Sequence, residues 1–144
     1  MSVFSLSNPK KMHDILDFYY EKDPDAVSVS FNSVNYTNKV IYNNVNSLIH
    51  NLKNNGLVPG DRIAILSKNN IAFIELLYAA SKYGLVLVPL NFRLAYPEID
   101  FILIDSGSKI LFYEPEFKEI VKQLETDKLS LTGLIEIGLE GKYE

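Results

Sequence analysis

The sequence contains no cysteine and only two histidines. Without a thiol it can form no disulfide framework, no thiolate nucleophile and no Cys-ligated zinc site. It also lacks the run of about 20 apolar residues that a membrane-spanning helix requires, so no transmembrane segment is expected. Residues 1–11 lack a basic stretch followed by an apolar one, so we expect no secretory signal and take a cytoplasmic location as the default.

Basic residues are also scarce. The 14 lysines and arginines stand against 18 acidic residues, which gives a net charge of −4 and a pI near 5.2. Nucleic-acid binding needs a basic patch that neutralises phosphates, and the lysines of this chain are dispersed, so no nucleic-acid partner is expected. There is no G-x-G-x-x-G either. A flavodoxin-like nucleotide binder is therefore an alternative that rests on fold analogy alone.

What remains is the composition of an ordinary globular protein, 47% hydrophobic and 22% charged over 144 residues. This length corresponds to about one domain. A chain of this size can bury roughly 68–70% of its unfolded surface, which is enough for a core.

The first part of the chain predicts a helix followed by a β-hairpin. Apolar residues line one side of a helix over Met12–Tyr20, and Asp23-Pro24 ends it because proline disfavours the helical conformation in the residue before it. Apolar and polar residues then alternate over Val27–Phe31, as in a half-buried strand. Asn32-Ser33 predicts a tight turn into a second strand over Val34–Tyr36.

A long amphipathic helix is predicted next. Thr37 is its expected N-cap, and apolar residues recur at 41, 45, 48 and 52. Gly56 suits the position just after its C-terminus. Pro59-Gly60 fits a type II turn, because proline fixes the first φ and glycine allows a positive second φ. The turn leads into a strand over Arg62–Leu66.

The rest of the chain repeats this alternation of helix and strand, which implies parallel strands joined by right-handed crossovers. The fold class is therefore α/β, a parallel sheet in three layers preceded by a small hairpin. An apolar strand such as Leu85–Leu90 is expected to be buried on both faces. The elements expected are a helix over Ile71–Tyr83 ending at Gly84, a strand over Leu85–Leu90, a helix from Pro97 to Gly107, a strand over Lys109–Tyr113, a helix over Glu116–Glu125 and a strand over Gly133–Ile137.

The glycine-rich stretch Gly56–Asp61 could be taken for a phosphate-binding loop. Such a loop needs free backbone N–H groups, a following helix N-terminus and usually a lysine. Here Pro59 removes one N–H donor and a strand follows instead of a helix. We therefore interpret the stretch as a structural turn.

The histidines and serines offer no catalytic set in the sequence. His13 and His50 lack a second ligand at metal-binding spacing, so both are expected to be surface or partly packed residues. Three serines, Ser67, Ser81 and Ser106, have no neighbouring histidine, so a nucleophilic triad is not supported.

Other polar groups are interpreted in the same way. The acids Glu98, Asp100 and Asp105 are expected on a solvated helix face. Asn91-Phe92-Arg93 follows a strand at the point where open α/β sheets bind ligands, so it either lines a ligand crevice or forms a turn in which Arg93 pairs with an acid. Five tyrosines are expected at the edge of the core: Tyr36, Tyr42, Tyr78, Tyr83 and Tyr96.

Six segments carry a family resemblance: Val34–Val40, Gly56–Ile63, Lys68–Asn70, Phe73–Tyr83, Ser81–Asn91 and Pro97–Leu111. In order and spacing they resemble the N-terminal region of the adenylate-forming (AMP-binding) enzymes, which include acyl-CoA synthetases, luciferases and peptide-synthetase adenylation domains. The resemblance covers about residues 12 to 137 and is most like an acyl-CoA synthetase. Asn35, Lys39 and Leu85 depart from the usual threonine, glutamate and alanine of these motifs.

The resemblance implies an activity that the chain itself does not complete. Members of the family activate a carboxylic acid with Mg-ATP as an acyl-adenylate, and many transfer the acyl group to coenzyme A. ATP, Mg and coenzyme A are thus implied for a parent enzyme acting on a fatty or aryl acid. The family's phosphate loop, its adenine and magnesium motifs and its lid lysine are not found in these 144 residues. We therefore assign no catalytic, cofactor-binding or metal-binding residue, and expect 1–144 to be an inactive N-terminal partial domain.

Two kinds of partner are expected from this. The first is the remainder of the parent polypeptide. The alternative is a free-standing assembly module that pairs with a separately encoded remainder or with itself, since an incomplete sheet exposes apolar surface and an unpaired edge.

Overall fold

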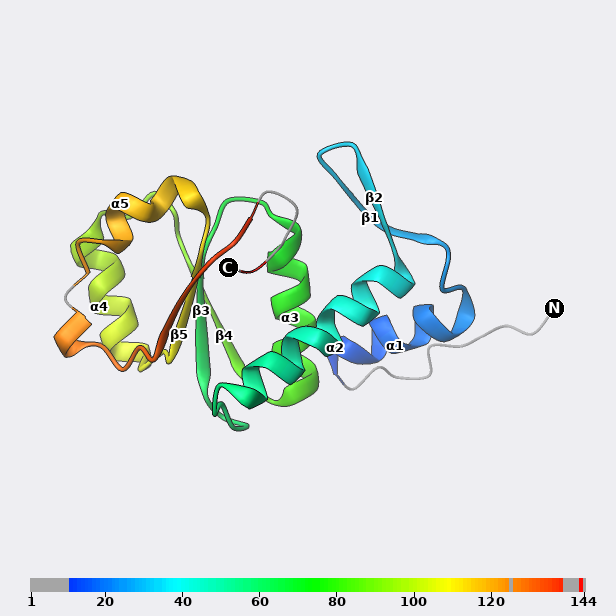
Figure 1. The fold of residues 1–144 in the computed structure, drawn as a ribbon, viewed down its shortest axis with the longest axis horizontal. Helices are drawn as coiled ribbons and strands as arrows, with labels where there is room; N and C mark the ends of the chain where they lie inside the picture. Colours follow the sequence, from blue (N-terminus) through cyan, green and yellow to red (C-terminus); the bar gives the residue numbers. More distant parts are fainter. Residues whose placement is uncertain (1–10, 125, 139–142, 144) are drawn as a thin grey trace.

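The computed structural model describes residues 11–124, 126–138 and 143. Figure 1 shows the sheet edge-on, with α1, α2 and α3 on one side and α4 and α5 on the other. This is the three-layer α/β arrangement predicted from the sequence. No helix in the described part of the chain is both long and apolar enough to cross a membrane.

The chain begins with the predicted helix and hairpin. Helix α1 spans Met12–Lys22 and ends at Asp23, whose ψ of 89° lies outside the helical region, as expected before a proline. The antiparallel strands β1 (Val27–Phe31) and β2 (Val34–Thr37) follow. The two residues between them, Asn32 and Ser33, have φ of +49° and +63°, as a two-residue hairpin turn requires.

Helix α2 spans Asn38–Asn54, and both of its predicted ends are confirmed. The Thr37 side chain accepts a hydrogen bond from the N–H of Val40 at 3.3 Å. At the other end Gly56 has φ of +80°, and its N–H reaches the carbonyl of Lys53. The N–H of Leu57 bonds the carbonyl of Leu52, which completes a Schellman motif.

The main sheet is parallel and has the order β4-β3-β5-β6. Its strands are β3 (Arg62–Leu66), β4 (Val86–Leu90), β5 (Ile110–Tyr113) and β6 (Gly133–Glu136). The parallel pairing confirms the prediction from the alternation of elements. The expectation that the strand at Leu85–Leu90 is buried on both faces is wrong, because β4 lies at an edge of the described sheet and Val86 is 49% exposed.

The two long helices that follow strands both end at glycines in the left-handed conformation. Helix α3 spans Ile71–Tyr83 and ends at Gly84, with φ of +87°, while α4 spans Tyr96–Ser106 and ends at Gly107, with φ of +60°. Both stops were predicted from the sequence. Asn70 is the N-cap of α3, since its side chain accepts the N–H of Ala72 at 3.1 Å.

The predicted single helix over Glu116–Glu125 is wrong. A 3₁₀ turn, η1 (Pro115–Phe117), leads into one short helix, α5 (Lys118–Val121). The bonds after it run from residue i to i−3 at Gln123 and Leu124, so the chain tightens instead of continuing as an α-helix. A second 3₁₀ turn, η2 (Thr126–Lys128), comes before β6, and residue 125 lies outside the described residues.

Alternate residues of the central strands build two separate cores. Ile63, Ile65 and Phe112 face the side of the sheet covered by α2 and α3. Ala64, Leu66 and their neighbours on β5 face the side covered by α4 and α5. The sequences of β3 and β5 are therefore continuous apolar runs, because both faces of these strands are covered.

Candidate functional site

The Pro-Gly turn at the amino end of β3 has no free donors for a phosphate. The N–H of Gly60 donates to the carbonyl of Gly84 at 2.7 Å, and the N–H of Asp61 donates to the carbonyl of Val58 at 3.0 Å. The N–H of Val58 donates to the Asp61 carboxylate at 2.8 Å. Gly56 and Leu57 use theirs to cap α2. The interpretation as a structural turn is confirmed.

The charged residues of this turn tie three elements together. The Asp61 carboxylate accepts a hydrogen bond from Lys109 Nζ at 2.8 Å, and together with the N–H of Val58 this lowers the pKa of Asp61. Arg62 Nε donates to the carbonyl of Ser106 at 2.6 Å, at the end of α4. The motif therefore joins β3 to the segment between α4 and β5, at the amino edge of the sheet.

The opposite, carboxyl edge carries the best candidate for a ligand site. β3 and β5 are neighbours, but α3 leaves β3 toward one face and α5 leaves β5 toward the other (Figure 1). Ligands of open α/β sheets bind at such a switch point. A hollow of about 300 Å³ lies there, lined by Phe31, Asn32, Asn70, Glu114, Pro115, Glu116 and Ile137.

Polar side chains order the loops on one side of this hollow. The Glu114 carboxylate accepts the Ser67 hydroxyl at 3.0 Å and the N–H of Lys68 at 3.1 Å. Lys68 Nζ lies 2.7 Å from the Glu116 carboxylate. This edge thus carries two carboxylates and one ammonium, a set better suited to a cationic or neutral group than to an anion.

The loop Asn91–Arg93 forms a turn and does not line that hollow. The Asn91 side chain accepts the N–H of Arg93 at 3.0 Å, as in the turn interpretation. Arg93 does not pair with an acid among the described residues, and its guanidinium lies 5.5 Å from the centre of the Phe92 ring instead.

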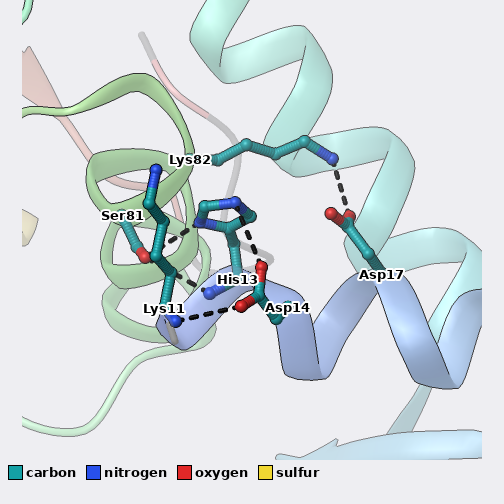
Figure 2. Close-up of polar contacts among 6 residues, drawn as sticks. All are labelled: Lys11, His13, Asp14, Asp17, Ser81 and Lys82. Atoms are coloured by element: carbon teal, nitrogen blue, oxygen red, sulfur yellow. Dashed lines mark hydrogen bonds and ion pairs between the residues drawn. The ribbon is translucent and has the colours of Figure 1, made fainter. Parts of the chain in front are cut away.

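The structure brings together a histidine and a serine that are 68 positions apart, so the expectation that Ser81 has no neighbouring histidine is wrong. Figure 2 shows His13 of α1 facing Ser81 of α3, with Asp14 beside it. His13 Nδ1 lies 3.1 Å from Ser81 Oγ, and His13 Nε2 lies 3.6 Å from Asp14 Oδ1. Sequence spacing gave no signal of this contact, because helix packing alone creates it.

The geometry of this cluster is that of an interhelical clamp. Ser81 Oγ also accepts the backbone N–H of His13 at 3.2 Å, so it caps one of the free donors at the start of α1. The Asp14 oxygen at 3.6 Å is too far to orient the imidazole through a hydrogen bond. Next to it, Lys82 Nζ pairs with Asp17 at 2.7 Å, a second link between α1 and α3 (Figure 2).

Replacing Ser81 with alanine should therefore weaken folding without removing a nucleophile. Losing a side-chain hydrogen bond to a free donor at a helix N-terminus costs about 0.5–2 kcal/mol, and we expect the free energy of unfolding to fall by that amount in urea titrations. We also expect no labelling of the wild-type protein by a fluorophosphonate probe, with a serine hydrolase as the positive control. Labelling that disappears in the S81A variant would contradict the clamp interpretation.

The remaining titratable candidates differ in their surroundings. His50 Nε2 lies 3.0 Å from the Asn54 side chain, one turn along α2. Glu98 caps the N–H of Ala95 at 3.0 Å, and Asp105 is exposed. Asp100 is only 9% exposed, so its expected place on a solvated face is wrong. It lies between Ile99 and Leu103 on the buried side of α4.

The tyrosines are mostly at the core edge as predicted. Tyr36 is buried, and Tyr42 stacks on Tyr20 with ring centres 3.9 Å apart. The Tyr83 hydroxyl donates to the carbonyl of Leu57 at 2.6 Å, and Tyr78 is partly buried. Tyr96 differs, since it is 40% exposed at the start of α4.

Glu75 is a buried acid that the sequence pattern did not single out. It is 1% exposed and accepts hydrogen bonds from Asn44 Nδ2 and from the Tyr143 hydroxyl, both at 2.7 Å. Burial raises the pKa of the Glu75 carboxyl, and the two donors offset this only in part. Burial and the nearby carboxylate likewise raise the pKa of Tyr143.

This raised pKa fixes the sign of a pH dependence. The folded protein holds the Glu75 proton more tightly than the unfolded chain does. Its contribution to stability is therefore complete below the ordinary glutamate pKa of about 4.3 and is lost as pH rises through the folded value. In the Glu75→Gln variant we expect the decline in unfolding free energy above about pH 4.3 to become shallower. Urea titrations at a series of pH values from acidic to neutral measure this decline for both proteins. The same decline in the variant as in wild type would contradict a raised pKa of Glu75.

A parallel α/β sheet with its hollow at the switch point between β3 and β5 has the architecture of a ligand-binding α/β protein. The chain belongs to the AMP-binding enzyme family, whose family model matches residues 17–141. This confirms the resemblance carried by the six segments.

Two relatives of this chain are named as an acyl-carrier-protein ligase and a CoA synthase. The chain is 38% identical over 107 residues to the fatty acid–[acyl-carrier-protein] ligase ScoC of Streptomyces coeruleorubidus. The aligned region covers 74% of this chain and 21% of that protein. It is 40% identical over 106 residues to the feruloyl-CoA synthase of Amycolatopsis sp, and this aligned region covers 74% of this chain and 22% of that protein. The chain thus spans about a fifth of the length of these relatives.

Solved structures give the same assignment. The N-terminal domain of FACL13 from Mycobacterium tuberculosis superposes with a TM-score of 0.82 at 30% identity, over 89% of this chain and 34% of that one. A fatty acyl CoA synthetase from Mycobacterium tuberculosis superposes with a TM-score of 0.81 at 30% identity, over 88% of this chain and 26% of that one. The predicted fold class, the N-terminal part of an acyl-CoA ligase, is therefore confirmed.

Proposed function

We propose that residues 1–144 are a partial domain that supplies the N-terminal scaffold of an AMP-forming acid–CoA ligase. The parent enzyme would activate a fatty or aryl acid with Mg-ATP and transfer the acyl group to coenzyme A in the cytoplasm. The family match over residues 17–141 supports the ligase assignment, and the names of the relatives support these acid classes.

The observation that carries the scaffold role is the use of the backbone donors in the Gly56–Asp61 turn. Adenylate formation needs donors and a metal that stabilise charge on the reacting phosphate. In this turn every N–H already bonds within the protein, and its charged side chains hold elements together. The proposed role of the chain is therefore to position other parts of the ligase, and it is inactive alone.

Acid-dependent exchange of pyrophosphate into ATP tests this proposal. We expect no exchange above background from the 144-residue chain with Mg-ATP and a panel of fatty and aryl acids. We expect exchange from the product of the gene read beyond the codon for Glu144, followed by thioester formation with coenzyme A. Exchange by the 144-residue chain would overturn the scaffold role. Transfer to an acyl carrier protein but not to coenzyme A would overturn the choice of thiol.

A second candidate function, a self-associating assembly module, is favoured by one surface feature. Phe101 and Ile104 lie three residues apart on α4 and are 67% and 43% exposed. Adjacent exposed apolar residues on one helix face are typical of a contact surface. Light scattering at increasing concentration tests it. A dimer that dissociates in a Phe101→Glu variant would support the assembly module, and a monomer at every concentration would exclude it.

A further inference from the structure

The hairpin strand β1 has an edge that no described element covers. Strand β1 pairs with β2 only, and β2 lies on one side of it. In a hairpin closed by a two-residue turn, the pair next to the turn, here Phe31 and Val34, exchanges both backbone hydrogen bonds. The N–H and C=O of Ser30 therefore point away from β2, where an added strand could bond them.

A groove runs along this edge. The hollow of about 300 Å³ at the carboxyl edge of the sheet is continued past Phe31 and Asn70 by a second hollow of about 260 Å³. Strand β1 forms one wall of this second hollow, and the first turn of α3 forms the other. Phe31, Phe73 and Ile74 make it apolar, so it can accept an apolar side chain from a strand paired at Ser30.

Amide and carboxylate side chains lie at the ends of the groove, and their chemistry indicates which kind of partner it can bind. Asn32 and Asn69 contribute amide side chains, which can bond a peptide backbone as donor or acceptor. The carboxylates of Glu114 and Glu116 lie at the end beyond Phe31, and Lys68 is the cation bonded to them there. The charge at this end favours a cationic group and disfavours an acidic one.

We propose that the free edge of β1 and this groove form a docking site for an extended peptide segment with a cationic residue at one end. The segment adds a strand to the hairpin through the backbone of Ser30. An apolar side chain enters the hollow beside Phe73 and Ile74, and a lysine or arginine lies next to Glu116. Main-chain bonds supply the affinity, and the apolar hollow and the acidic end supply the specificity.

Synthetic hexapeptides test the proposal directly. The probe is fluorescein-labelled Lys-Thr-Val-Thr-Val-Thr. One comparison peptide starts with glutamate, and another has prolines in place of both valines and cannot pair as a strand. We expect saturable binding of the lysine peptide in fluorescence anisotropy, about five- to tenfold weaker binding of the glutamate peptide, and none of the proline peptide. Amide NMR shifts should map to Val29–Asn32 and Asn69–Ile74.

A charge-reversed variant separates this site from general attraction to an acidic protein. The Glu116→Lys variant should bind the glutamate peptide better than the lysine peptide. Asp105→Lys is the matched control, because it makes the same charge change on an exposed position of α4 and should leave the preference unchanged. Circular dichroism of both variants checks that they are folded.

Several results would overturn the proposal. They are the absence of saturable binding by the lysine peptide, equal binding of the proline peptide, and shifts that map elsewhere. If Asp105→Lys changed the preference between the two peptides as much as Glu116→Lys does, the effect would come from the net charge of the protein and not from this site. Concentration-dependent shifts at Val29–Asn32 without peptide would show that a second copy of the chain occupies the edge.

Discussion

Replacing Gly84 with alanine is expected to lower the free energy of unfolding by about 2–5 kcal/mol. Two costs add at this position. Gly84 has φ of +87°, a conformation that costs an L-residue about 1–2 kcal/mol. A Cβ there would also lie 3.3 Å from Cβ of Pro59, and such overpacking costs about 1–3 kcal/mol. Neither atom can move freely, because the carbonyl of Gly84 is bonded to the N–H of Gly60.

Gly56→Ala is the matched control for this prediction. Gly56 has a similar φ of +80°, but an added Cβ would meet no atom within 4 Å. Only the conformational cost applies, so we expect a loss of about 1–2 kcal/mol. Both substitutions restrict the unfolded chain equally, and that effect cancels in the comparison. Equal losses in urea titrations of the two variants would show that the contact with Pro59 carries no energy.

This contact joins two of the segments that carry the family resemblance. The Pro-Gly turn and the glycine that ends α3 are 24 or more positions apart in the chain, yet Gly84 rests on Pro59 and bonds Gly60. Each glycine was predictable by itself from local backbone rules. Their meeting was not, because it depends on how β3 and β4 pair.

The fold was predictable where local signals agree with packing. The two central strands and the helices between them follow from apolar runs bounded by caps and glycines, and Arg62–Leu66 and Ile71–Tyr83 match the structure residue for residue. The edge position of β4 had a signal in Pro89, which cannot donate to a sheet ladder and so favours an edge.

The candidate site was less predictable, since its parts come together only in the tertiary structure. The hollow at the carboxyl edge combines the tip of the hairpin with loops after β3 and β5. The rule that places ligand sites beyond strand ends points to Asn91–Arg93 after β4 when the strand order is not known, whereas the hollow lies beyond β3 and β5. The contact between His13 and Ser81 is similar: it depends on the packing of α1 against α3, which no spacing in the chain encodes.

The Phe112→Ala variant is expected to lose about 3–5 kcal/mol, a large share of the roughly 5–15 kcal/mol that stabilises a typical domain. Phe112 is fully buried on the central strand β5 and belongs to the core between the sheet and helices α2 and α3. Its ring packs edge-on against Tyr143 with centres 5.7 Å apart. Truncation removes the apolar contacts of the ring and leaves a cavity that a strand paired on both sides cannot close.

Phe101→Ala removes the same atoms from a position on α4 that is 67% exposed, so it isolates the effect of burial. Its unfolding free energy should stay within about 0.5 kcal/mol of the wild-type value, since surface substitutions rarely change stability by more. Thermal and urea unfolding of the two variants measure the difference.

A loss for Phe101→Ala close to that for Phe112→Ala, at protein concentrations where the chain is monomeric, would mean that α4 is covered within the monomer. Comparable stability of Phe112→Ala and wild type would mean that the core on the α2–α3 side does not hold the sheet in place. The larger loss at Phe112 is expected because the central strands of this sheet are stabilised from both faces, and each face depends on side chains that alternate along β3 and β5.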